Sequence, residues 1–82
     1  MAIWPNPAQD YFNYKLTNHN FSENYHFRLF NPSGYLIRDW KFNGRQSLGH
    51  FNTEDVEEGI YFLSLVSENG EILKTMKLVI IR

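Results

Sequence analysis

The sequence predicts an all-β domain, an immunoglobulin-like antiparallel β-sandwich of six to seven strands. Short runs of β-branched and aromatic residues recur along the 82 residues without a sustained helical period. Clusters of Pro, Gly and Asn separate these runs at short intervals. No segment resembles a helical crossover between parallel strands, so antiparallel pairing is expected.

The first element is an extended entry at Trp4-Pro5-Asn6-Pro7, because the two prolines lack an N–H and restrict the residues before them. After a turn, residues 11–16 alternate as a half-buried strand. Residues 17–24 are polar and turn-prone, which predicts a loop anchored by the ring of Phe21. The core face of the 11–16 strand is predicted to carry Phe12, Tyr14 and Leu16.

Residues 25–30 and 35–42 are predicted to form a hairpin. Asn31-Pro32-Ser33-Gly34 between them suits a tight turn, because Pro fixes φ at the second position and Gly allows freedom at the last. The predicted core residues are Tyr25, Phe27 and Leu29 in the first strand and Leu36, Trp40 and Phe42 in the second.

The next two elements carry weaker signals. Asn43-Gly44 predicts a turn into a strand at residues 46–51, which Gly49 weakens. Residues 53–58 are expected to form one helical turn with Thr53 as its cap and Val56 in the core. Gly59 should end this turn, at a point where a side chain would clash or force an unfavourable φ.

Residues 60–66 are apolar at both parities, which predicts a central strand covered on both faces. Asn69-Gly70 is typical of a hairpin turn into a last strand at residues 72–81. The end of that strand is apolar on both faces, so at a sheet edge it would offer backbone groups to a receptor strand. Burial of the same strand within the sandwich is the alternative, and the two are compatible.

Composition limits the classes of function. Residues 3–82 are expected to be a single domain, with Met1 and Ala2 added by cloning. The net charge of −1 argues against a nucleic-acid partner. The longest apolar run, residues 78–81, is far shorter than the roughly 20 residues that span a bilayer. Without cysteine, packing alone must stabilise the fold.

The sequence predicts no enzymatic activity, no metal and no cofactor. Cysteine and known nucleophile or phosphate motifs are missing, and His19, His26 and His50 are dispersed. Four carboxylates near the turn before residue 59 could be interpreted as a calcium site. They lack the alternating acids of an EF-hand, so a solvated turn is the preferred interpretation. This acidic group consists of Glu54, Asp55, Glu57 and Glu58.

The aromatic residues leave a rival function open. Trp4, Trp40 and the tyrosines could form a platform for sugar rings, which would make the domain a carbohydrate-binding or adhesive module of a surface enzyme. In so small a domain they are more simply explained as core, with Trp40 a stronger core candidate than Trp4.

Three phrases at matching distances resemble the C-terminal sorting domain, type A, of the type IX secretion system of Bacteroidetes. They are WPNPAQDYF, LFNPSGYLI and GIYFLSL, the last leading through Asn69-Gly70 to KLVIIR. Trp4 and Asn31 depart from the family, which more often has Tyr and Asp there. The residues that match the family's motifs are Pro5, Asn6, Pro7, Gly34, Gly59, Ile60 and Tyr61.

The resemblance implies that the domain is a secretion signal for a larger parent protein. The parent would be exported, pass through the periplasm and reach the cell surface or the medium. The implied partners are the outer-membrane translocon and a sortase-like peptidase that removes the domain. Recognition by the translocon is expected at Lys77, Leu78, Val79, Ile80, Ile81 and Arg82. A weak homodimer through an exposed edge strand is a further expectation.

Overall fold

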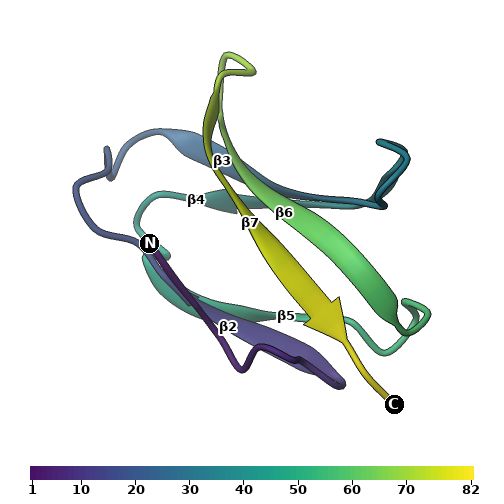
Figure 1. Ribbon diagram of the computed structural model, residues 1–82. Helices are drawn as coiled ribbons and strands as arrows, with labels where there is room; N and C mark the ends of the chain where they lie inside the picture. Colours follow the sequence, from purple (N-terminus) through teal and green to yellow (C-terminus); the bar gives the residue numbers. More distant parts are fainter.

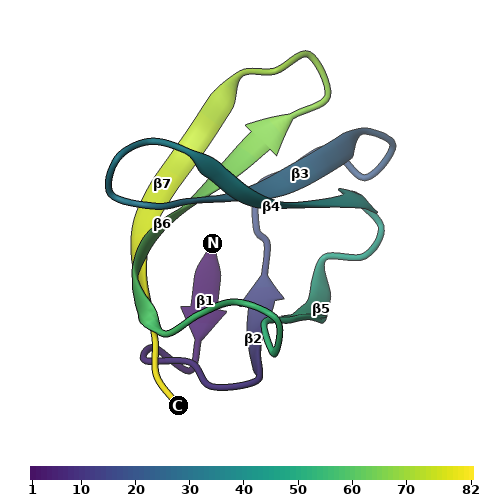
Figure 2. The ribbon, with the colours of Figure 1, turned by 90° about the vertical axis from the view of Figure 1, so that its right-hand side faces the viewer.

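The computed structural model describes all 82 residues and confirms the all-β prediction. Figures 1 and 2 show a three-stranded sheet in the order β1-β2-β5 facing a four-stranded sheet in the order β4-β3-β6-β7. Every neighbouring pair of strands is antiparallel. The strands are β1 (Ala2–Trp4), β2 (Tyr11–Lys15), β3 (Asn24–Phe30), β4 (Leu36–Asn43), β5 (Leu48–Asn52), β6 (Gly59–Ser67) and β7 (Ile72–Ile80).

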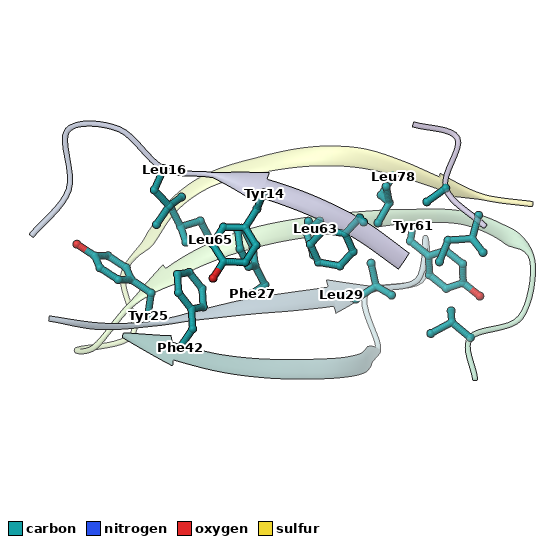
Figure 3. Close-up of a cluster of buried hydrophobic side chains, with 14 residues drawn as sticks. Tyr14, Leu16, Tyr25, Phe27, Leu29, Phe42, Tyr61, Leu63, Leu65 and Leu78 are labelled. Atoms are coloured by element: carbon teal, nitrogen blue, oxygen red, sulfur yellow. The ribbon is translucent and has the colours of Figure 1, made fainter. Parts of the chain in front are cut away.

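The core lies between the two sheets and is rich in aromatic rings (Figure 3). Phe27 is fully buried at its centre, and its ring stacks on Phe42 with 5.0 Å between centroids. The rings of Phe12 and Tyr14, from the opposite sheet, meet Phe27 edge-on. The core faces predicted for residues 11–16 and 25–30 are confirmed, because all six of their predicted residues are buried: Phe12, Tyr14, Leu16, Tyr25, Phe27 and Leu29.

The β3–β4 hairpin forms as predicted, but one of its core residues was assigned to the wrong face. The Gly34 N–H donates to the Asn31 carbonyl at 2.9 Å, and Gly34 has a φ of +91°, a region that favours glycine. Leu29 pairs with Arg38 but Phe30 pairs with Leu36, so Ile37 is an extra residue in a β-bulge. The bulge reverses the alternation, and Leu36 is exposed.

The remaining core predictions for β4 stand. Phe42 is buried, and Trp40 is partly buried and packs against the core. The weak strand expected at residues 46–51 is present as β5, which begins and ends slightly later.

Phe21 does not anchor the loop before β3, as predicted, because its side chain is 60% exposed. Two polar contacts hold this loop instead. His19 Nε2 lies 2.6 Å from the Gly44 carbonyl, and the Asn20 N–H donates to the Tyr25 hydroxyl at 2.9 Å. A backbone carbonyl and a tyrosine hydroxyl outside the loop therefore replace the expected hydrophobic anchor.

The helical turn predicted at residues 53–58 is wrong, because these residues form non-helical turns. Thr53 does not cap a helix: its hydroxyl donates to the Gln9 carbonyl at 3.0 Å, while Asn52 Oδ1 accepts from the Glu54 N–H at 2.7 Å. Val56 is buried as predicted.

Gly59 lies at the start of β6, as predicted, but of the two expected obstacles to a side chain, a clash and an unfavourable φ, only the φ is present. A Cβ there would meet Tyr61 Cε2 at 3.5 Å, which is an ordinary contact and no clash. The φ of +158° is the remaining constraint on a side chain.

β6 is a central strand, as predicted, hydrogen-bonded to β3 on one side and β7 on the other. The expectation that both of its faces are covered is wrong at its first half. Ile60 is 47% exposed and Phe62 39% exposed, because the second sheet covers only the opposite face. The Asn69-Gly70 turn and the strand that follows it are confirmed. The structure contains no helix with the length and apolar character needed to cross a membrane.

Tyr14→Phe is expected to make the domain less sensitive to alkaline pH. Burial raises the pKa of the Tyr14 phenol above its ordinary value, so the folded state holds this proton more tightly than the unfolded state. The stability that depends on a protonated Tyr14 is therefore fully present below about pH 10, and it is lost as the pH rises through the pKa of Tyr14 in the folded state. The substitution also removes the hydrogen bond to the Gln46 carbonyl, which costs about 0.5–1.5 kcal/mol at neutral pH.

Urea unfolding at neutral and alkaline pH would measure both effects, with Tyr35→Phe as the control because Tyr35 is highly exposed. An equal alkaline loss in the Tyr14→Phe variant and the parent would contradict this account.

Candidate functional site

The candidate site is the second half of β7, where the recognition residues were expected. β7 is the last strand of its sheet, as Figure 1 shows. Leu78 and Ile80 are fully buried in the core, whereas Val79 is half-buried and Lys77, Ile81 and Arg82 are exposed. The residues expected to be read by the translocon thus divide into a buried pair and a set that reaches the surface.

The outward edge of this half-strand is covered by residues 6–8, which we name the N-terminal clasp. Asn6 Nδ2 donates to the Lys77 carbonyl at 2.8 Å, and Asn6 Oδ1 accepts from the Val79 N–H at 3.1 Å. One side-chain amide thus supplies the donor and the acceptor that a neighbouring strand would supply. The peptide bonds before Pro5 and Pro7, on either side of Asn6, are both cis.

Ala8 continues the clasp through backbone hydrogen bonds. Its N–H donates to the Val79 carbonyl and its carbonyl accepts from the Ile81 N–H, both at 2.8 Å. Ala8 is fully buried and forms a parallel bridge with Ile80. The clasp therefore adds a short parallel segment to the edge of the four-stranded sheet.

Arg82 closes the end of the sandwich below the clasp. Its guanidinium donates to the carbonyls of Gln9, Thr53 and Val56, with 2.7 Å between Nη2 and the Thr53 oxygen. Hydrogen bonds from a charged donor are about twice as strong as neutral ones. Arg82 consequently ties the end of β7 to two loops that are distant in the sequence.

The motif residues converge on the same half-strand, with one exception. Gly59, Ile60 and Tyr61 pair with Ile80, Val79 and Leu78, respectively. The Tyr61 hydroxyl donates to the Glu57 carbonyl at 2.6 Å, which fixes the turn before β6. Gly34 lies in the β3–β4 turn, and no atom lies within 4 Å of a Cβ placed on it.

Sequence reasoning identified both Asn6 and the C-terminal strand but did not connect them. The signal was the pair of prolines, which suggested an irregular entry and gave no indication of its partner. The other candidate residues lie apart. No group of three or more His, Asp and Glu side chains could hold a metal ion, and within the acidic turn Asp55 forms an ion pair with Arg38 at 2.9 Å.

Asn6→Asp is expected to lower the free energy of unfolding by about 0.5–1.5 kcal/mol, since the Lys77 carbonyl would lose its donor and face a carboxylate oxygen. Thermal unfolding would measure the change. The matched control is Asn18→Asp, which makes the same charge change at an exposed residue whose positive φ asparagine and aspartate both tolerate. Equal melting temperatures for the two variants would show that the Asn6 amide does not stabilise the edge.

Comparison with known proteins identifies the family of this chain. Residues 2–81 match the model of a family described as the secretion system C-terminal sorting domain. Neither the curated proteins nor the solved structures gave a match. Because the family model covers nearly the whole chain, the two-sheet domain built around the clasped C-terminal strand belongs to the family of type IX secretion system C-terminal sorting domains.

Proposed function

We propose that this domain directs a larger parent protein across the outer membrane through the type IX translocon. The parent is in transit in the periplasm, a sortase-like peptidase then removes the domain, and the mature cargo is attached to the surface or released. Membership of the sorting-domain family supports a secretion signal and, with it, export to the cell surface or the extracellular space. A sorting signal of this kind is not itself catalytic.

The observation that carries the proposal is the convergence of separate motif segments on β7. Residues 5–8 and 59–61 flank residues 77–81 from opposite edges and hold them in one conformation. We propose that the translocon reads residues 77–82 in this conformation. In the folded domain the side chains available to it are those of Lys77 and Ile81, with part of Val79, because Leu78 and Ile80 are buried. Arg82 is exposed, but its guanidinium is already bonded to carbonyls of the domain.

The direct test is export of a fluorescent reporter fused to residues 3–82 behind a signal peptide. The fusion is expected in the medium or on the surface of a type IX-competent host and in the periplasm of a translocon-deficient mutant. A folded, intact fusion that stays in the periplasm of both strains would contradict the proposal. Mass spectrometry of the exported reporter would show whether the domain is removed and at which bond.

A carbohydrate-binding role is the second candidate, because two aromatic side chains lie exposed on the outer face of the three-stranded sheet. They are Trp4, which is 42% exposed, and Tyr11, which is 47% exposed. Trp40 is unavailable for such a role, since it packs against Phe12 and Phe51. Loss of polysaccharide retention in a folded Trp4→Ala variant would support this candidate, and retention equal to that of the parent would exclude Trp4 from it.

A further inference from the structure

The first half of β7 has an uncovered edge. The clasp forms hydrogen bonds with the backbone groups that point away from β6, from the Lys77 carbonyl to the Ile81 N–H. It reaches no further along the strand. Backbone groups alternate sides along a strand, so the N–H and C=O of Thr75 and the N–H of Lys77 also point away from β6. No strand follows β7 in the sheet, and these groups face solvent.

The side chains along this half-strand are basic and apolar. Lys74 and Lys77 are exposed, and neither forms an ion pair. Ile72 is 62% exposed and Leu73 46% exposed, which leaves apolar area beside the two charges. No carboxylate lies within β7 itself. The edge therefore combines free hydrogen-bonding groups with uncompensated positive charge.

This charge selects among possible occupants. Antiparallel pairing of two copies of β7 around Thr75 would bring four lysines to one seam. The two Lys74 side chains would then be diagonal neighbours on one face, within reach of long side chains, and their like charges would repel each other. A strand that carries carboxylates would instead gain backbone pairing and charge complementarity. Lys74 and Lys77 lie on opposite faces of the sheet, so the complementary strand presents a carboxylate to each face.

The clasp is internal evidence that the edge accepts an added segment. Ala8 pairs with Ile80 by the backbone bonds that a strand of another protein would form further along the same edge. We propose that residues 73–77 of β7 are a docking edge for an extended acidic β-strand of a partner protein. This deepens the proposed function, on which it rests only for the expectation that the partner belongs to the secretion apparatus. The docking edge precedes the terminal residues along β7 and shares only Lys77 with them.

The binding test uses the whole isotope-labelled domain and a capped peptide of alternating valine and threonine that carries two glutamates on opposite faces. Amide signals of Thr75 and Lys77 are expected to shift and to become protected from exchange. The acidic peptide should bind at least about tenfold more tightly than the same peptide with lysines in place of the glutamates. Absence of saturable shifts at millimolar peptide, shifts confined to other strands, or equal binding of both peptides would overturn the proposal.

Charge reversal provides the matched comparison. The Lys74→Glu/Lys77→Glu double variant should lose the preference for the acidic peptide. A Lys15→Glu/Lys41→Glu variant makes the same net charge change at exposed lysines of β2 and β4 and should keep it. Melting temperatures of both variants would show that they fold. If the lysines merely protect the edge from aggregation, as edge lysines often do, the two variants would bind the peptide alike, which would also overturn the proposal.

Export then separates this proposal from the proposed function. Lys77 also belongs to the residues proposed to be read by the translocon, so the export test changes Lys74 alone. Reporter export by the Lys74→Glu fusion should fall at least about tenfold below that of a Lys15→Glu fusion, by the loss of the same charge complementarity. If the parent fusion is not exported in the competent host, the proposed function fails, whatever the peptide result. If the parent and the Lys74→Glu fusion are exported equally, the docking edge is overturned and the proposed function stands.

Discussion

Phe27→Ala is expected to lower the free energy of unfolding by about 3–5 kcal/mol. Phe27 is fully buried, and its ring contacts Phe12 and Tyr14 from one sheet and Phe42 from the other. Removing the ring therefore opens a cavity at the point where the two sheets meet. A small domain has a total stability of about 5–15 kcal/mol, so this single loss approaches the lower limit.

Thermal unfolding of this variant should show a melting temperature at least about 12 °C below that of the parent, at about 4–8 °C per kcal/mol for a domain of this size. Phe62→Ala is the matched control, because Phe62 lies in the neighbouring strand β6 but is partly exposed on the outer face. Similar losses in the two variants would mean that the interior is not centred on Phe27.

Deletion of residues 78–82 is expected to unfold the domain as well as to abolish export of a fused reporter. Leu78 and Ile80 are fully buried, and truncating one such side chain to alanine alone costs about 2–5 kcal/mol. The deletion also removes the partners of Ala8 and the guanidinium of Arg82 that binds three distant carbonyls. Together these losses match or exceed the stability expected of the domain.

Circular dichroism and the dispersion of amide signals would measure whether the shortened domain folds. A cooperative melting transition in the deletion variant would contradict the role assigned to these residues in the core. Export of the deletion fusion at the parent's level would show that the tail is not the signal.

A Lys77→Ser/Ile81→Ser variant separates recognition from folding, since both side chains are exposed. It should remain folded and should lose export if the translocon reads these positions.

The features of the fold that depend on local sequence were predictable. Period-two alternation identified the core faces around Phe12 and Phe27, and turn residues located both hairpins. The prediction that Leu36 lies in the core was wrong because a bulge at Ile37 reverses the alternation of β4. Two adjacent aliphatic residues give no sign of which one faces inward. The prediction that Thr53 caps a helical turn was wrong because its hydroxyl can serve equally as a cap or as a donor to a distant carbonyl. Only the tertiary fold brings the Gln9 carbonyl near.

The candidate site was predictable in its parts and not in its assembly. The C-terminal strand was located at the right residues, and Asn6 was recognised within its motif. Asn6 and Lys77 are 71 residues apart, and no periodicity or spacing rule links positions at that separation. The half-exposed face of β6 was missed for a similar reason, because an apolar sequence does not reveal whether a second layer covers Ile60.

The clasp also has a consequence for the order of events during synthesis. Asn6 is made 71 residues before its partner Lys77 and 73 residues before Val79, and the Arg82 contact with Gln9 also spans 73 residues. Contacts of such long separation form late in folding, because loop closure must come first. A nascent domain interrupted before these residues would lack the assembled edge. The clasp thus makes the conformation of the signal depend on synthesis of the domain at least through Val79.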